Sequence, residues 1–396
     1  MLDIFEKCRN FTRARETREA GIYPYFTPLS GNDGPRVWID GREIIMIGSN
    51  NYLGLTHDPR VVEAAIEATR RYGTSCSGSR FLNGTLDLHV KLEKILAEFM
   101  KREAALVFST GYMTNLGALG TLAGSNDIIV MDKSDHASIY AGTVAALRAT
   151  IKRYNHSDMD SLENVLASLP EDKGKIIVSD GVFSMEGDIV KLDRIVELAQ
   201  KYNARIYIDE AHGVGVLGDN GRGSCEHQGL EDKVDLIMST FSKSLASLGG
   251  FIAGKEDIID YIKHKSSPLI FSAAPTPAAT AAVLKALEII QNEPERIKRL
   301  QHIADYMLKE FKNMGFDTGV SDGTPIIPLY VRNDDRTFIF WHRLFDAGIY
   351  ANAVVSPAVP SDEALIRTSF MSTHSDEDLT RVLEIVRKVG KELDII

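Results

Sequence analysis

The residues best placed to do chemistry are a lysine and an aspartate, each of which lies at the end of a short apolar segment or shortly after it. Lys243 lies in STFSKSLASLGG, among hydroxyls and glycines, after the segment VDLIM. Asp209 ends the segment ARIYID and begins DEAH. If both segments are strands of one parallel sheet, the two side chains share the crevice beyond the carboxyl ends of the strands. Taken alone, Lys243 is equally well explained as a loop lysine with a packed stem or as a catalytic amine with a shifted pKa.

A third segment supplies what a phosphorylated cofactor would need. FSTGYMTN, residues 108–115, is predicted to be a strand end, a Ser-Thr-Gly turn and a helix start, whose free N–H groups can hold a phosphate. Thr240 and Ser242 add hydroxyls beside the lysine. A lysine for a Schiff base, an acid for a pyridinium nitrogen and a phosphate cradle together predict a pyridoxal 5'-phosphate (PLP) site.

Two other motifs match the patterns of different protein classes, but the residues around them do not support those matches. GVGVLG, residues 213–218, fits the dinucleotide pattern, but a turn-rich segment follows it instead of a helix. DEAH occurs in helicases, but the chain has no G-x-x-x-x-G-K-[ST] loop to hold a triphosphate.

Four motifs carry a resemblance to a known family. DHAS (135–138), SDGVFSMEGD (179–188), DEAHG (209–213) and STFSKSLASLGG (239–250) resemble the α-oxoamine synthases, a branch of the fold-type I PLP enzymes. The likeness covers nearly the whole chain. It implies an α/β fold like that of aspartate aminotransferase, with a large domain built on a mostly parallel sheet and a smaller C-terminal α+β domain.

The resemblance also implies roles for individual residues around the cofactor ring. Lys243 would form the Schiff base, and Asp209 would meet the pyridine nitrogen. His212 and Ser184 would address the phenolic oxygen of the ring, and His136 would stack on its open face. Alone, each of these histidines would more simply be a hydrogen-bonded turn residue.

Further roles concern the phosphate and the substrate. The remaining residues expected at the site are Gly111 and Tyr112 with Thr240 and Ser242 at the phosphate, Ser272 and Ala273 reaching in from a second subunit, and Asn50 and Arg367 at the substrate. The active unit would then be a homodimer with shared active sites, and no metal is expected. Arg367 taken alone would be an ion-paired core arginine.

Members of this family condense a small amino acid with an acyl-CoA and release carbon dioxide. The stretch GTSCSGSRFLNGTLDLH, residues 73–89, resembles the branch that uses L-serine and a long-chain acyl-CoA. Ser75, Ser77 and the pair Ala274-Pro275 depart from that branch, which leaves the thioester less well defined than the cofactor. A sibling enzyme using glycine or alanine, a silent partner subunit and a PLP-dependent transcription regulator are the alternatives. The regulator would require a DNA-binding module for which the chain has no spare length.

The elements that must position these residues alternate between apolar segments and helices. Residues 1–50 are predicted to form an N-terminal arm and a hairpin with its turn at Asp40-Gly41, 51–280 the large PLP-binding domain and 281–396 the small domain. The segments ALVF, DIIVMD, KIIVSD and ARIYID are predicted strands of a sheet that is covered on both faces. A capping box of Ser375 and Asp378 predicts the start of the last helix.

Composition limits the partners and the compartment. The 396 residues carry a formal charge of −10, which argues against nucleic acid as a partner. The cysteines Cys8, Cys76 and Cys225 lack metal-site spacing, and the start of the chain has no signal-peptide pattern. A cytoplasmic protein without a transmembrane segment is therefore expected, with peripheral contact to a membrane left open.

Overall fold

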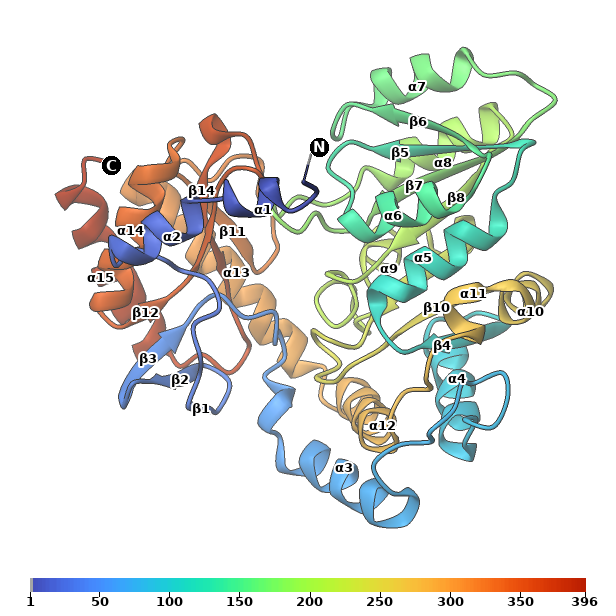
Figure 1. Ribbon diagram of the computed structural model, residues 1–396, viewed down its shortest axis with the longest axis horizontal. Coiled ribbons are helices and arrows are strands. Elements are labelled where there is room, and N and C mark those ends of the chain that lie inside the picture. Colours follow the sequence, from blue (N-terminus) through green and yellow to red (C-terminus); the bar gives the residue numbers. More distant parts are fainter. Residues whose placement is uncertain (1–2) are drawn as a thin grey trace.

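The computed structural model describes residues 3–396, and Figure 1 shows how their elements divide around a long connecting helix. The N-terminal part comprises α1 (Glu6–Arg9), α2 (Arg13–Glu19), β1 (Gly31–Asn32), β2 (Arg36–Ile39) and β3 (Arg42–Met46). β2 and β3 pair antiparallel through a turn at Asp40 and Gly41, whose φ angles are 49° and 74°. Two successive positive φ angles are typical of a type I′ turn, so the predicted hairpin is confirmed.

The central element is a seven-stranded sheet with the strand order β4-β10-β9-β8-β7-β5-β6. Its strands are β4 (Ala104–Phe108), β5 (Asp127–Asp132), β6 (Thr150–Tyr154), β7 (Gly174–Asp180), β8 (Arg205–Asp209), β9 (Leu236–Thr240) and β10 (Gly250–Gly254). β10 is antiparallel to both of its neighbours, whereas the pairs from β9 to β6 are parallel. The expectation of a mostly parallel sheet is confirmed.

The strands are apolar because both faces of the sheet are covered. In β4, Val107 packs into one hydrophobic cluster, and its neighbours Leu106 and Phe108 pack into another. One face is covered by α5 (Gly111–Leu122), α6 (Ala137–Ala145), α10 (Glu256–Lys265) and α11 (Ser267–Ile270). The other is covered by α4 (Asp87–Phe99), α7 (Met159–Ala167), α8 (Leu192–Lys201) and α12 (Pro277–Asn292). Side chains that alternate along a strand thus bury apolar surface on both sides.

Shorter elements complete this part of the molecule. They are η1 (Leu55–His57), α3 (Pro59–Tyr72), α9 (Ser224–His227) and η2 (Glu231–Lys233). α3 packs along α12, as the lower part of Figure 1 shows.

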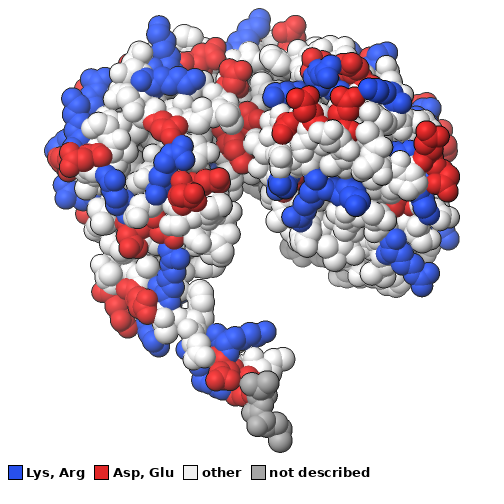
Figure 2. Space-filling model, turned by 90° about the horizontal axis from the view of Figure 1, so that it is seen from above, with Lys and Arg blue, Asp and Glu red and all other residues white. Residues whose placement is uncertain are grey.

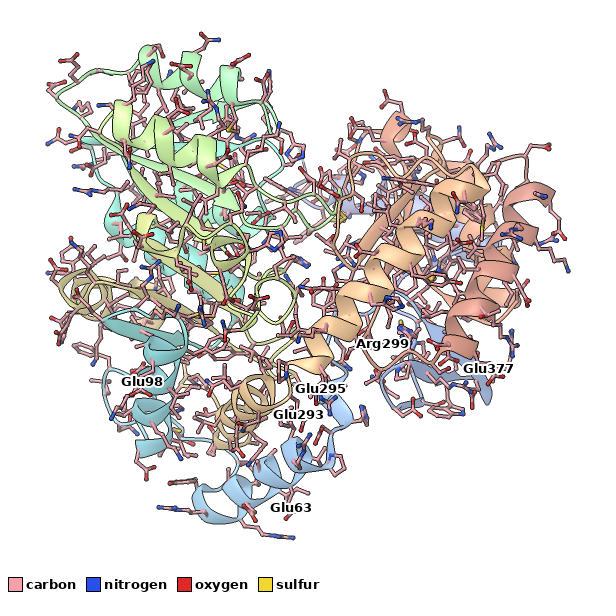
Figure 3. The ribbon with its side chains drawn as sticks, turned by 180° about the vertical axis from the view of Figure 1, so that it is seen from behind. Glu63, Glu98, Glu293, Glu295, Arg299 and Glu377 are labelled. Atoms are coloured by element: carbon pink, nitrogen blue, oxygen red, sulfur yellow. The ribbon has the colours of Figure 1, made fainter. Side chains whose placement is uncertain are left out.

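The C-terminal part begins with α13 (Glu295–Met314), the long helix that connects the two halves. It continues with β11 (Ile326–Tyr330), α14 (Asp334–Asp346), β12 (Ile349–Tyr350), β13 (Asn352–Val354), η3 (Ser361–Glu363), β14 (Leu365–Ser369) and α15 (Asp376–Glu392). Figure 3 shows Glu293 just before α13 and Arg299 along it, and Arg299 forms an ion pair with Asp376 at the start of α15. The capping box of Ser375 and Asp378 at α15 is confirmed.

The N-terminal hairpin packs with the C-terminal part. β3 pairs parallel with β12, and Ile45 and Ile47 lie in the same hydrophobic cluster as Phe340 of α14 and Ile366 of β14. The domain boundaries at residues 50 and 280 stay predictions. No helix within residues 3–396 is both long enough and apolar enough to cross a bilayer.

Candidate active site

A cavity of about 270 Å³ lies where β8, β9 and β7 end, at the start of α5 and α6. Its lining residues are Thr110, Gly111, Tyr112, His136, Ser138, Asp180, Asp209, Ala211, His212, Met238, Thr240, Ser242, Lys243, Leu248 and Gly249. Because parallel strands end at one edge of the sheet, residues from distant parts of the sequence meet there. The cavity therefore brings together Lys243, Asp209, His136, His212 and the expected phosphate cradle.

Lys243 lies in the tight turn between β9 and β10. The turn closes through the Ala246 N–H, which donates to the Lys243 carbonyl at 3.0 Å. Burial lowers the pKa of Lys243 to about 8, and the nearby charges of Asp209 and Asp180 only partly oppose that decrease. An unprotonated amine, which can act as a nucleophile or base, is therefore far more abundant near neutral pH than it would be for an exposed lysine.

Asp209 ends β8 and is only 2% exposed. The Asn115 side chain donates from Nδ2 to its Oδ2 at 2.6 Å, and the Ala211 N–H donates to its Oδ1 at 2.9 Å. The Tyr207 hydroxyl donates to Asn115 Oδ1 at 2.7 Å, which turns the amide nitrogen of Asn115 toward the aspartate. The carboxylate is thus oriented by donors but has no cationic partner at ion-pair distance among residues 3–396.

His136 is the N-cap residue of α6 and lies beside a second buried carboxyl group. Its Nδ1 is 2.7 Å from Ser138 Oγ, and its backbone N–H donates to Asp180 Oδ2 at 3.0 Å. Burial lowers the pKa of His136, and the charge of Lys243 adds to that effect while Asp209 opposes it. Burial also raises the pKa of Asp180 well above its ordinary value, and the nearby negative charges of Asp209 and Asp135 raise it further. His136 is thus a neutral imidazole whose position is fixed through its own backbone.

The start of α5 forms an anion-binding arrangement with two hydroxyls. Thr110 caps the helix by accepting a hydrogen bond from the Met113 N–H. Gly111 packs against Thr240 so closely that a Cβ atom would lie 2.6 Å from Thr240 Oγ1. Thr240 Oγ1 is in turn 3.0 Å from Ser242 Oγ. Free N–H groups at a helix start, together with hydroxyl donors, suit a phosphate.

Arg367 lies in β14, behind the cavity, and is only 4% exposed. Its Nε donates to the Ser184 carbonyl at 2.5 Å, and its Nη2 donates to Asn50 Oδ1 at 3.1 Å. No carboxylate within residues 3–396 lies at ion-pair distance from this guanidinium, so its charge is available to a bound carboxylate. Ser184 contributes its carbonyl to this contact, and neither Ser184, Asn50 nor Arg367 lines the cavity itself.

Ser272 and Ala273 lie outside the cavity, in the segment between α11 and α12. The Ala273 carbonyl accepts a hydrogen bond from the Ser109 hydroxyl, and Ala274 N–H donates to the Gly78 carbonyl at 2.9 Å. Their expected place at the phosphate of a second subunit stays a prediction. Within residues 3–396, no cluster of three or more His, Cys, Asp or Glu side chains is arranged to hold a metal ion.

The structure adds residues that the sequence did not single out. Asn115, itself held by Tyr207, orients the side chain of Asp209. Tyr52 contacts the ring of His212, and Asp180 accepts a hydrogen bond from the backbone N–H of His136. Asn115 and Asp180 lie in the stretches FSTGYMTN and SDGVFSMEGD. A polar residue inside an element that is expected to be buried could have identified them as residues of the site.

Comparison with known proteins places this geometry in a family. Residues 42–386 match the family model for aminotransferase class I and II. Serine palmitoyltransferase from Sphingobacterium spiritivorum is 48% identical over 392 residues, which cover 99% of this chain and 98% of that protein. An 8-amino-7-oxononanoate synthase from Thermoanaerobacter pseudethanolicus is 41% identical over 385 residues, 97% of each chain. A solved serine palmitoyltransferase from S. paucimobilis, with a bound PLP–myriocin aldimine, superposes with a TM-score of 0.97 at 32% identity and full coverage of both chains. The predicted fold-type I architecture is confirmed.

Proposed function

The chain belongs to the class I and II aminotransferase family, and from that premise we propose that it is a PLP-dependent acyltransferase. It condenses L-serine with a long-chain acyl-CoA such as palmitoyl-CoA and releases CoA and carbon dioxide. The product is 3-ketodihydrosphingosine, at the first step of sphingolipid synthesis. The observation that carries the proposal is that Lys243, Asp209 and His136 line one cavity, while Arg367 has no carboxylate at ion-pair distance among residues 3–396.

The residues of the cavity fit PLP. Lys243 would bind the aldehyde carbon, Asp209 would face the ring nitrogen, and the start of α5 with Thr240 and Ser242 would hold the phosphate. Gly111 packs closely on Thr240 and has no side chain that could cover the N–H groups at the start of α5. This supports the assignment of the phosphate to that position. When bound, the cofactor supplies an electron sink for the carbanion at the α-carbon of the amino acid.

Different side chains of the site remove the proton, stabilise the protonated ring nitrogen and bind the substrate carboxylate. Lys243 Nζ removes the proton from the α-carbon of serine as general base, for which a pKa of about 8 is well suited near neutral pH. Asp209, oriented by Asn115, keeps a proton on the ring nitrogen through its negative charge. Arg367 binds the serine carboxylate, and His136 helps to hold it. Fixing the carboxylate in this way can contribute several kcal/mol to the barrier reduction.

A homodimer with shared active sites belongs to the proposal. The segment that carries Ser272 and Ala273 presents Phe271 with 83% of its surface exposed, and nearby Leu82 is 78% exposed. The N-terminal arm projects away from the body of the molecule, as Figure 2 shows, and its Phe11 is 69% exposed. Exposed apolar residues on a projecting arm and beside the site support a second copy that covers them.

On the face that Figure 2 shows, acidic and basic side chains are interspersed, and the formal charge of the chain is −10. This distribution supports small substrates, and no nucleic acid, as partners. The cytoplasmic location is likewise a proposal, and fractionation of cells between membrane and supernatant would test it together with peripheral membrane contact.

The sibling reaction, with glycine or alanine as the amino acid, is the second candidate because of the 41% identical 8-amino-7-oxononanoate synthase. The purified protein should be assayed with L-serine, glycine and L-alanine, each paired with palmitoyl-CoA and with acetyl-CoA. CoA release and product mass are followed, and Lys243→Ala serves as the inactive control. We expect L-serine with palmitoyl-CoA to be the best pair. A clear preference for glycine with acetyl-CoA would contradict the proposed substrates while leaving the cofactor assignment intact.

A further inference from the structure

A line of polar groups, buried except for the half-buried Asn50, connects His212, which lines the cavity, to Arg367, which does not. His212 Nδ1 lies 2.6 Å from the Tyr52 hydroxyl oxygen, and that oxygen lies 3.2 Å from Asn50 Oδ1. Asn50 Oδ1 in turn accepts a hydrogen bond from Arg367 Nη2 at 3.1 Å. Tyr52 and His212 are 0% and 6% exposed, so solvent does not supply the missing partners of these groups. The hydrogen bonds along this line therefore have to be made with the protons that its own side chains carry.

The donors and acceptors at the two ends are fixed. The guanidinium of Arg367 can only donate, so the atom of Asn50 that faces it has to be the amide oxygen. Burial lowers the pKa of His212 well below its ordinary value, and the charges of Lys243 and Arg367 lower it further. The imidazole is therefore neutral and carries one proton, on either Nδ1 or Nε2. Tyr52 has a single hydroxyl proton and two neighbouring acceptors.

The two distances decide where that proton lies. A donating hydroxyl typically makes contacts of 2.5–3.0 Å, whereas a donating N–H typically makes contacts near 2.9–3.0 Å. The 2.6 Å contact between Tyr52 and His212 is thus too short for a typical imidazole N–H donor and fits a hydroxyl donor. The 3.2 Å contact with Asn50 is too long for a hydroxyl donor, and Asn50 Oδ1 already accepts from Arg367.

We propose that Tyr52 is a positioning residue that donates to His212 Nδ1 and thereby fixes the proton of the imidazole on Nε2. No group within residues 3–396 accepts a hydrogen bond from Nε2, so this donor is left for a bound molecule in the cavity. Given the proposed function, on which this step rests, the acceptor is the phenolic oxygen of the cofactor ring. Tyr52 then acts on the reaction through His212. The Arg367 side chain also lies close to the Tyr52 hydroxyl, but its hydrogen bond to Asn50 Oδ1 does not require that hydroxyl.

Tyr52→Phe removes only the hydroxyl and is the direct test. Selective ¹⁵N labelling of the histidines in the cofactor-loaded protein shows which ring nitrogen carries the proton, and the His212 signal is assigned with His212→Asn. We expect a proton on Nε2 in the unmodified chain and a shift toward a mixture of tautomers in Tyr52→Phe. Turnover should fall roughly tenfold or more, because a buried acceptor loses its donor. The affinity for L-serine should change less than about threefold, because Arg367 keeps its partner.

The matched control is Tyr154→Phe, which removes the hydroxyl of another fully buried tyrosine that neither lines the cavity nor contacts His212. It should change neither the His212 signal nor the balance between turnover and serine affinity. A proton on Nδ1 in the unmodified chain would overturn the proposal, and that measurement does not depend on whether a variant folds. An Nε2 proton that persists unchanged in Tyr52→Phe would overturn the role of Tyr52. Absence of condensing activity in the unmodified enzyme would refute the proposed function and leave the tautomer measurement readable.

Discussion

His156 is half-buried and forms a charge cluster with two aspartates, which should make the stability of the protein depend on pH. Its Nδ1 lies 3.1 Å from Asp132 Oδ1, at the end of β5, and its Nε2 lies 3.3 Å from Asp188 Oδ2. The ring also meets the edge of Phe183, with the ring centroids 4.4 Å apart. Burial disfavours the charged imidazole, but the two carboxylates outweigh burial and raise the pKa of His156 to about 10. The imidazolium thus ties the sheet to the segment that carries Ser184.

The size and sign of the effect follow from this pKa. Each tenfold change in proton affinity corresponds to about 1.4 kcal/mol, and the side chain of His156 is 23% exposed, so solvent screens part of the interaction. We therefore expect the charged form to contribute about 2–4 kcal/mol to the free energy of unfolding. Because the pKa is raised in the folded state, this stabilisation is complete below the ordinary value of 6.5 and is lost as the pH rises toward 10.

His156→Gln, which keeps polar atoms but cannot be protonated, tests this reasoning. Urea unfolding should give a free-energy loss of about 2–4 kcal/mol at pH 6.5, shrinking steadily between pH 7 and pH 10. His264→Gln is the matched control, because the side chain of His264 is 54% exposed and should contribute little at either end of the range. A loss that is equally large at pH 6.5 and pH 10 would mean that His156 acts through packing, and would refute the charge argument.

Three further predictions concern the site and the assembly. Asp209→Asn should retain the cofactor but lower turnover by roughly a hundredfold or more, measured by CoA release, because the charge facing the ring nitrogen is removed; near-normal turnover would exclude the assigned role. Arg367→Gln should weaken L-serine binding roughly ten- to a hundredfold and leave the visible spectrum of the resting enzyme unchanged. Unchanged serine affinity would place the carboxylate elsewhere. Sedimentation should show a dimer at assay concentrations, with Ser272→Trp lowering activity through the neighbouring site, and a fully active monomer would contradict the shared-site assembly.

The parts of the site that the sequence could predict are those fixed by strand ends. A strand buried on both faces has a continuous apolar pattern, and the first polar residue after it marks the carboxyl edge of the sheet. Asp209 was located in this way, whereas Lys243 lies in the polar turn that follows the segment VDLIM, and both line the cavity. The turn at Asp40 and Gly41 was equally predictable, because few residue pairs accept two positive φ angles.

Other elements lacked a pattern of this kind. β10, with the sequence GFIAG, is rich in glycine, and β6, with the sequence TIKRY, is an edge strand with exposed charges. Neither shows the β-branched apolar run of the central strands. The supporting contacts of the site were equally hidden, because they join distant positions: Asn115 and Asp209 are 94 residues apart, and Tyr52 and His212 are 160 apart. Only the fold determines which polar residues of one segment meet those of another.

Near neutral pH, the group in the cavity whose charge is expected to respond to pH is the amine of Lys243. Burial lowers the pKa of both His136 and His212, so neither imidazole gains charge in this range. Burial and the neighbouring carboxylates raise the pKa of Asp180 well above its ordinary value. The amine of Lys243, with a pKa of about 8, loses its charge as the pH rises through this range. The two histidines can therefore position the substrate without competing with Lys243 for protons, and the free base needed at the α-carbon becomes more abundant as the pH increases.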